Sequence, residues 1–325
     1  MIPDRWYPIL EASKLGRRPV GLQRMGERLV LWRDGSGAPV VLPGFCPHRG
    51  ADLGQGRVQD GELSCPWHGF RFEAGGRCTR MPCEGREAPI PKALHLAPYP
   101  TREASGLVWL WWGEARAELP EIPFFDEGRD PRGTAQASYV LPYHYSRMVE
   151  TNLDIHHTPF VHGNVIPVGE RVDGFEASLQ GDRIETRGVL RREGKAEGMT
   201  FRADLILPGT GLIELTPKLH ILVVSTPVDE GHTWLWFRYH SRYTRLPALR
   251  RLLSWLSVQS ELRVVQRQDW RIFRSMAPGT IDDFPYRFVH ADAGIALYRK
   301  RRRELLDAAV PRSTGVAAAR LAVGT

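Results

Sequence analysis

Two short stretches decide the fold of this chain: Cys46-Pro47-His48-Arg49-Gly50 and Cys65-Pro66-Trp67-His68-Gly69-Phe70. Each holds one cysteine and one histidine beside a proline and a glycine, and residues 49–64 separate the two pairs. Two thiolates and two imidazoles can hold either one zinc ion or a [2Fe–2S] cluster. A zinc finger usually places its cysteines in one half-site and its histidines in the other. Because each stretch offers one of each, the pattern favours a cluster with both cysteines on one iron and both histidines on the other. A structural zinc is the alternative.

The length and composition are typical of a soluble protein with more than one domain. The chain has 325 residues, of which 42% are hydrophobic and 25% charged, and this length suits two domains with full cores. No apolar run approaches the ~20 residues that cross a bilayer, and the N-terminus lacks the layout of a signal peptide. We therefore expect a cytoplasmic protein without a membrane span.

The cysteines and the charged residues indicate the compartment and the possible partners of the protein. Besides Cys46 and Cys65 the chain has only Cys78 and Cys83, which we expect to be free thiols in a reducing compartment. The net charge is +7, with basic runs at 245–251 and 298–303. Aromatic residues do not alternate with these runs on a strand, so nucleic-acid binding is not indicated. We interpret the runs as solvated helix faces, with docking of an acidic electron donor as the alternative.

The hydrophobic periodicity predicts an α+β chain of two domains. Residues 1–115 are expected to be all-β, because short apolar strands alternate with Gly and Asp turns, and the tryptophans of 106–113 are expected to pack in its core. The Pro- and Gly-rich segment 116–138 is predicted to be a linker, and 311–325 a disordered tail. Residues 139–310 should form the second domain, with strands at 183–190, 200–207, 212–216, 219–226 and 232–240 and helices at 146–162, 247–275 and 293–308.

A second group of possible metal ligands lies in the second domain, in the stretch Glu150-Thr-Asn-Leu-Asp154-Ile-His156-His157-Thr-Pro-Phe-Val-His162. Non-heme Fe(II) that activates O2 is commonly held by two histidines and one carboxylate on one face, with the other face open. From the residues alone, a metal site and a set of surface histidines are both possible readings of this stretch.

Both constellations resemble one known family. The pairs C-P-H-R-G and C-P-W-H-G-F resemble the Rieske [2Fe–2S] motif, and N-L-D-x-x-H-x-P-F-x-H resembles the D-x2-H-x4-H segment of Rieske non-heme iron oxygenases. The likeness extends over about residues 5–305 and is nearest to the chlorophyllide a oxygenase, pheophorbide a oxygenase and vanillate O-demethylase-like branches. It implies a Rieske domain, followed by a helix-grip (START-like) catalytic domain with an antiparallel sheet. In this resemblance the cluster ligands are Cys46, His48, Cys65 and His68.

The resemblance also implies a mononuclear iron held by His157, His162 and a carboxylate from a late helix. The family has an aspartate there, followed by an apolar pair and a glutamine. Glu261 stands at the aligned position, so we expect Glu261 to be the third ligand. Asp269 and Asp283 are the alternatives, as is a site without a protein carboxylate.

Asp154 has a different role in the family. The resemblance implies that it hydrogen-bonds the iron ligand His157 and the cluster ligand His68 of a neighbouring subunit, and so carries electrons between subunits. That arrangement implies a homotrimer ring. His156 is expected at the surface or behind the iron ligands, pointing away from Asp154 and His162 on a helix.

The implied reaction is the oxidation of a hydrophobic aromatic or polycyclic small molecule by O2, through hydroxylation or demethylation. The chain has no G-x-G-x-x-G fingerprint for a nicotinamide or flavin, so a ferredoxin or a flavin-dependent reductase must supply electrons. Ring cis-dihydroxylation, an electron carrier without oxygenase activity, and a zinc-stabilised binding module are the alternatives. The pocket is expected among the aromatic residues of the second domain, namely Tyr143, Tyr145, Phe160, Trp234, Trp236 and Phe237.

Overall fold

The computed structural model describes residues 1–276 and 279–309, and these divide into two compact units. The first holds Met1–Ile122 together with the described residues from Leu306 onward, and the second holds Pro123–Leu305. The linker predicted over 116–138 reaches too far, because strand β11 (Thr134–Leu141) already belongs to the sheet of the second unit. The Pro- and Gly-rich composition ends at Gly133, and the β-forming residues that follow pair with a neighbouring strand. The tail predicted over 311–325 lies outside the described residues.

The first unit is built from small antiparallel sheets, as the sequence predicted. Within its described residues, the strand orders are β1-β10-β9, β2-β3-β4 and β5-β6-β7-β8. The tryptophans of β10 pack inward: Trp109 and Trp111 are buried, and Trp112 packs in part against the core. The bounds are β1 Arg5–Glu11, β2 Val20–Arg24, β3 Glu27–Arg33, β4 Pro39–Pro43, β5 Arg57–Gln59, β6 Glu62–Ser64, β7 Arg71–Phe72, β8 Cys78–Arg80, β9 Thr101–Ala104 and β10 Leu107–Trp112.

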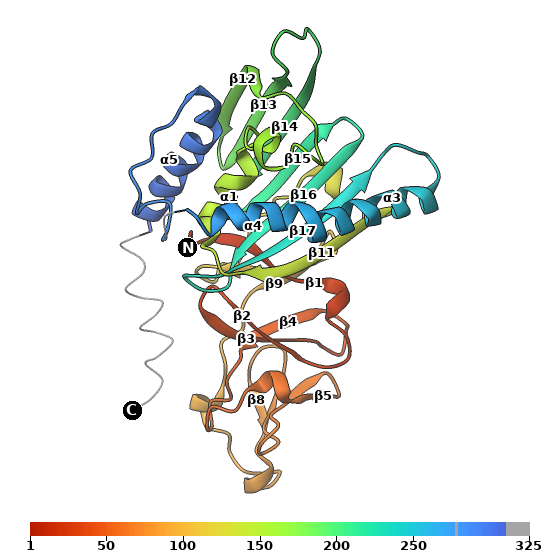
Figure 1. Cartoon of the computed structure of the whole chain (residues 1–325). Helices are drawn as coiled ribbons and strands as arrows, with labels where there is room; N and C mark the ends of the chain where they lie inside the picture. Colours follow the sequence, from red (N-terminus) through yellow and green to blue (C-terminus); the bar gives the residue numbers. More distant parts are fainter. Residues whose placement is uncertain (277–278, 310–325) are drawn as a thin grey trace. The chain divides into compact units, whose positions relative to one another are not determined.

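The second unit is organised by one antiparallel sheet of seven strands, in the order β11-β17-β16-β15-β14-β13-β12 within its described residues (Figure 1). The five strands predicted from the sequence correspond to β13–β17, whereas β12 was missed. Strand β12 pairs on one side only and its residues are mostly exposed, so it lacks the apolar alternation of an inner strand. The bounds are β12 Arg171–Gln180, β13 Arg183–Arg191, β14 Gly198–Ile206, β15 Thr210–Thr216, β16 Leu219–Pro227 and β17 Thr233–Ser241.

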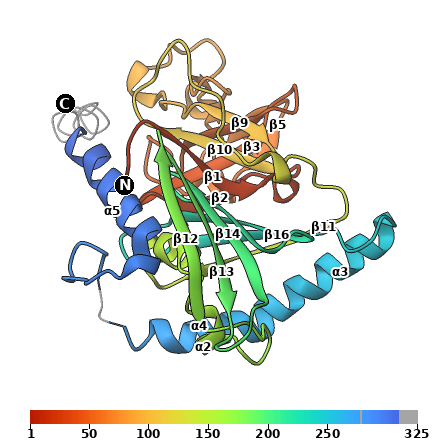
Figure 2. The same cartoon turned by 90° about the horizontal axis from the view of Figure 1, so that it is seen from above.

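Helices cover one face of this sheet. A long helical segment, made of α3, the π-helical turn η6 and α4, runs across the sheet beside β11, β16 and β17 (Figures 1 and 2). The single helix predicted over 146–162 is two helices, because Asp154 leaves helical geometry after α1 and Pro159 starts α2. The bounds are α1 Tyr145–Leu153, α2 Thr158–Val161, α3 Pro247–Ser260, η6 Glu261–Val265, α4 Gln266–Phe273 and α5 Ala293–Asp307.

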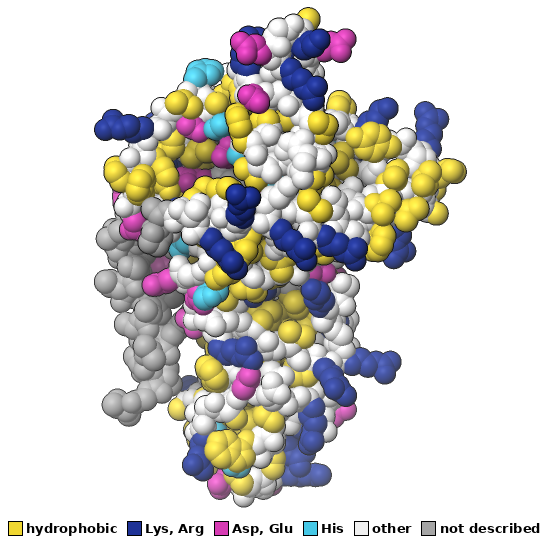
Figure 3. Space-filling model, in the orientation of Figure 1, with side chains coloured by type: hydrophobic (Ala, Val, Ile, Leu, Met, Phe, Trp, Pro, Cys, Tyr) yellow, Lys and Arg dark blue, Asp and Glu magenta, His cyan; other side chains and the backbone are white. Residues whose placement is uncertain are grey.

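The two basic runs behave differently. On α3 and the loop before it, Arg245 and Arg251 are exposed as expected. Figure 3 shows exposed hydrophobic and basic side chains next to one another on this face of the molecule. On α5 the expectation of a solvated face is wrong, because Arg299 and Arg302 turn inward. Arg299 pairs with Glu150 at 2.6 Å, and Arg302 is 6% exposed. The Arg299–Glu150 pair therefore ties α5 to α1.

Candidate metal centres

The two Cys-His loops of the first unit close in the same way. In each loop the cysteine carbonyl accepts a hydrogen bond from the glycine N–H four residues on, at 2.8 Å from Gly50 to Cys46 and 3.1 Å from Gly69 to Cys65. Both glycines have φ of +71°, a conformation that costs glycine little and other residues more. The glycine in each motif is therefore needed for the turn that brings cysteine and histidine of one loop to the same end of the unit.

The four side chains are arranged in two layers. The Cys46 and Cys65 thiols are buried in the core of the unit, whereas the His48 and His68 rings lie outside them with centroids 4.8 Å apart. Burial, together with the neighbouring Cys65 thiol, raises the pKa of Cys46 to about 12, so the thiolate needs a cation beside it. This arrangement, with buried sulfurs beneath outer imidazoles, matches a cluster in which the cysteines hold one iron and the histidines hold the other.

A single zinc ion fits these four residues less well. A tetrahedral zinc draws its ligand atoms close together, because each Zn–S or Zn–N bond is only about 2.0–2.3 Å long. Among the described residues, the group of His, Cys, Asp or Glu side chains placed to hold a single ion is in the second unit, and it does not include these four.

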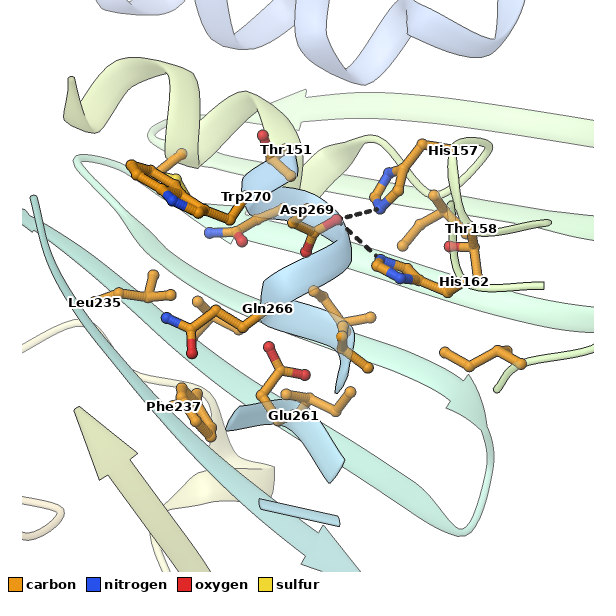
Figure 4. Close-up of a pocket in the computed structure, with 18 of the residues that line it drawn as sticks. Thr151, His157, Thr158, His162, Leu235, Phe237, Glu261, Gln266, Asp269 and Trp270 are labelled. Atoms are coloured by element: carbon orange, nitrogen blue, oxygen red, sulfur yellow. Dashed lines mark ion pairs between the residues drawn. The ribbon is translucent and has the colours of Figure 1, made fainter. Parts of the chain in front are cut away.

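That close group consists of His157, His162 and Asp269, called here the trio. The Oδ1 atom of Asp269 lies 3.0 Å from Nε2 of His162 and 3.8 Å from Nε2 of His157, and the two rings meet edge to face. Figure 4 shows all three side chains converging on one point at the edge of a pocket. Two imidazoles and one carboxylate with an open side are the donor set of mononuclear non-heme iron, so the residues present fit that metal.

Local structure explains why these three residues meet. The one-turn helix α2 separates the two histidines, with His157 just before it and His162 just after it. Asp269 comes from α4, where Gln266, Asp269, Trp270 and Phe273 all line the pocket. This i, i+3, i+4, i+7 spacing is one face of an α-helix, and the residues between these positions include exposed arginines.

Gln268 orients His162 from behind. Its Oε1 atom lies 3.0 Å from His162 Nδ1, and its Nε2 atom donates to Asn164 Oδ1 at 2.7 Å. Since the amide oxygen can only accept, Nδ1 carries the proton and Nε2 is left free for a metal. Burial alone would lower the pKa of His162, but Asp269 and Gln268 outweigh burial and raise it. The sequence analysis missed this role of Gln268, although its place directly before Asp269 was a usable signal.

Asp154 lies beside His157 and also contacts His156. Its Oδ1 atom accepts from the His157 backbone N–H at 3.2 Å, and it lies 3.6 Å from His157 Nδ1 and 3.1 Å from His156 Nδ1. Burial alone would raise the pKa of Asp154, but its interactions with the histidines lower it. The expectation that His156 points away from Asp154 is wrong, because the chain has left the helix at Asp154 and His156 turns back toward it.

Glu261, the third ligand favoured from the sequence, is not part of the trio. Its carboxylate accepts a hydrogen bond from the Tyr239 hydroxyl at 2.7 Å instead. Glu261 and Asp269 both line the pocket, but Asp269 is eight positions further along the helical segment, about two turns away. Figure 4 shows Glu261 well away from the two histidines. This geometry favours Asp269 over Glu261 as the carboxylate beside the two histidines.

The pocket beside the trio has a volume of about 130 Å³ and is lined mainly by aliphatic and aromatic side chains. Of the six aromatic residues expected there, only Phe237 lines it. Successive side chains of a strand point to opposite faces, so Leu235, Phe237 and Tyr239 face the pocket and the tryptophans of β17 do not. Phe160 is 70% exposed.

Residues 5–100 match the family model of the Rieske [2Fe-2S] domain. The chain is 27% identical over 318 residues to the Arabidopsis thaliana protein TIC 55, chloroplastic, covering 91% of this chain and 58% of that protein. It is 34% identical over 165 residues to the 3-chlorobenzoate-3,4-dioxygenase oxygenase subunit of Comamonas testosteroni (50% and 38%). It is 32% identical over 257 residues to chlorophyllide a oxygenase, chloroplastic, of Chlamydomonas reinhardtii (72% and 37%).

The fold has a close counterpart among solved structures. The crystal structure of dicamba monooxygenase bound to dicamba superposes with a TM-score of 0.76 at 21% identity, over 96% of this chain and 99% of that one. The chain belongs to the Rieske non-heme iron oxygenases. Its cofactors are therefore a [2Fe–2S] cluster and a mononuclear iron. Within that family it is similar to the chlorophyllide a oxygenase and TIC 55 proteins, and it spans between 37% and 58% of the length of the three relatives above. Within the described residues, none of the helices has the length and apolar character to cross a membrane.

Proposed function

We propose that this protein is an oxygenase that uses O2 and electrons from a ferredoxin or a flavin-dependent reductase to hydroxylate or demethylate a hydrophobic aromatic compound. The observation that carries the proposal is the trio at the edge of an apolar pocket, in a chain that also holds the two Cys-His loops. A cavity of about 150 Å³ holds a benzene-sized molecule, so the volume of about 130 Å³ favours a single-ring substrate over a polycyclic one.

The ligand sets follow from the two centres. We assign the cluster to Cys46, His48, Cys65 and His68, and the iron to His157, His162 and Asp269. When bound, the two metal groups supply stored electrons and the activation of O2. The remaining tasks fall to the chain: Gln268 keeps the proton of His162 on Nδ1, and the aliphatic walls exclude water from the substrate.

We further propose that electrons pass between subunits of a homotrimer, from His68 of one chain through Asp154 of the next to His157. This proposal is supported by the solvent exposure of side chains at the cluster and at Asp154, where the two subunits would meet. The Asp154 side chain is 31% exposed although it contacts His157, and Phe45 and Trp67 beside the cluster loops are 53% and 57% exposed. Large apolar side chains around the histidine ligands suit burial against a neighbouring subunit.

The alternative within the same class is ring cis-dihydroxylation, which is favoured by the 34% identity to a subunit named as a dioxygenase. An electron carrier without oxygenase activity is the alternative from another class. Iron content separates the two classes, because an oxygenase of this kind holds about three irons per chain and a carrier about two.

The test of the proposal is substrate-dependent O2 uptake with a reconstituted ferredoxin and reductase. A panel of single-ring methyl ethers and methylarenes would be offered, with products identified by mass. Formaldehyde release or a single added oxygen is expected. A product that gains both oxygen atoms on adjacent ring carbons would favour the dioxygenase, and a protein with three irons that consumes no O2 with any ring compound would contradict the proposal.

The two cysteines outside the cluster loops support a proposal for the cellular compartment of the protein. Cys78 and Cys83 are both free, although both belong to the first unit. Free thiols are typical of a reducing compartment, so we propose the cytoplasm, while noting that two relatives carry the word chloroplastic in their names. Thiol labelling of the protein inside intact cells tests this, and a Cys78–Cys83 disulfide in freshly lysed cells would argue against it.

A further inference from the structure

The pocket has a second polar end, away from the trio. There the Tyr239 hydroxyl donates to Oε2 of Glu261 at 2.7 Å, and Glu261 Oε1 has no hydrogen-bond partner among the described residues. A carboxylate can accept several hydrogen bonds. Both residues line the cavity, so one carboxylate oxygen is available to a molecule that occupies it.

The charges around this end favour one kind of ligand. No lysine or arginine belongs to the described lining, whose ionisable members are the trio, Glu261 and the tyrosines Tyr139 and Tyr239. At the Glu261 end, an anionic group would therefore meet a carboxylate and no lysine or arginine. A cationic or hydrogen-bond-donating group would meet an acceptor in apolar surroundings, where such a contact is strong.

The raised pKa of Glu261 shows that its negative charge is unfavourable in this buried position unless a positively charged or hydrogen-bond-donating group lies beside it. Burial raises its pKa to about 7, and the negative charge of Asp269 acts in the same direction. The Tyr239 hydrogen bond and His162 act in the opposite direction but only in part. A ligand N–H⁺ beside Glu261 would favour its charged form over the protonated one.

We propose that Glu261, held by Tyr239, is the substrate anchor of this pocket, and that the substrate is a single-ring compound bearing an amine at the end opposite the oxidised carbon. This inference rests on the proposed oxygenase function for the reaction, but not for the binding. It separates this protein from enzymes whose substrates are ring carboxylates. The anchor and the trio lie at opposite ends of the cavity (Figure 4), so a ring bound to one presents its far side to the other.

Calorimetric binding to the holoprotein tests the anchor directly. The probes are 4-methoxybenzylamine, 4-methoxytoluene and 4-methoxybenzoate, which share ring and methoxy group and differ in charge. The amine should bind roughly 10- to 100-fold more tightly than either of the others, as expected for a hydrogen bond between charged groups. Glu261→Gln should remove that preference, Tyr239→Phe should reduce it, and Glu170→Gln, which changes an exposed carboxylate, should leave it intact.

The binding experiment distinguishes a failure of the Glu261 anchor from a failure of the proposed oxygenase function. Glu261→Gln retains an oxygen that can accept from Tyr239, so its cluster absorbance and circular dichroism should match the parent protein. Equal affinities for the three probes, no measurable binding of the amine, or an amine affinity that survives Glu261→Gln would overturn the anchor. Glu261-dependent amine binding without O2 consumption would leave the anchor standing and contradict the oxygenase.

Discussion

At the scale of single residues, the two acidic residues of the pocket, Asp269 and Glu261, lie at different positions along the long helical segment. Asp269 lies level with His157 and His162, and Glu261 lies about two turns away, where Tyr239 holds it. Asp269→Ala should therefore reduce iron from about three to about two atoms per chain while the cluster spectrum stays unchanged. Glu261→Ala should retain all three. Iron analysis combined with visible absorption measures both, and loss of the mononuclear iron in the Glu261 variant alone would restore the assignment made from the motif.

Gln268 offers a finer test of the same centre. Its amide oxygen fixes which nitrogen of His162 carries the proton, and groups of this kind behind a ligand typically contribute 10- to 100-fold in metal affinity. Gln268→Leu should weaken iron binding by roughly that factor, measured by competition with a chelator. The matched control is Gln259→Leu on α3, which should leave the affinity unchanged. Equal weakening in both variants would point to general loss of helix stability.

The residues that we assign to the two centres could be proposed from the sequence where they are close together along the chain, and not where they are distant. Cys46 with His48, and His157 with His162, lie within a few residues of each other, so their spacing carries the geometry. Asp269 comes from another helix, 107 residues after His162. Its place depends on how α4 packs across the sheet, which spacing alone does not record.

At the scale of elements, the N-terminus of α1 contains a pH-sensitive cap. His144 Nδ1 accepts from the Ser146 backbone N–H at 3.3 Å. Burial, followed by the charge of Arg302, lowers the pKa of His144 to about 4. The folded protein thus keeps His144 neutral, while the unfolded chain takes up a proton below about pH 6.5. The free energy of unfolding should fall as the pH drops below 6.5, by roughly 2 kcal/mol between pH 7 and pH 5.

His144→Ser isolates this contribution, because serine keeps an oxygen that can cap the helix and does not titrate. Urea unfolding of both proteins at pH 7 and pH 5 gives the comparison. The variant should lose about 2 kcal/mol less than the parent protein over this interval. Equal losses would mean that His144 is protonated in the folded state as well.

Elements were predictable where their hydrophobic pattern is regular. Inner strands β13–β17 and the long helical segment carry strong periodicity and were found. Strand β12 at the sheet edge is mostly polar, and β11 follows directly on a Pro- and Gly-rich stretch. The break between α1 and α2 has a visible signal in Pro159, but the histidine pattern across it also fits one continuous helix.

At the scale of the whole molecule, the subunit-crossing route can be tested with two inactive variants. Cys46→Ser should disable the cluster, and Asp269→Ala should disable the iron. In a ring of three chains mixed at random, an intact iron meets an intact cluster on the neighbouring chain about one time in four. Co-expression of the variants should therefore restore about one quarter of the parent activity.

Each variant expressed alone should be inactive, which is the control. If electrons passed within one chain, the mixture would be as inactive as its components. A protein that elutes as a monomer in size-exclusion chromatography at working concentration would also count against the ring.

The π turn η6 has a consequence for how such pockets diversify. It begins at Glu261 and ends before Asp269, and a π turn is an α-helical turn with one residue added. Loss of that residue would rotate Glu261 by about 100° relative to Asp269, so the anchor would leave the cavity while the metal site stayed whole. A single-codon deletion could thus change the charge of the accepted substrate in one step. Natural variants of this protein that differ in length at η6 are expected to differ in substrate charge.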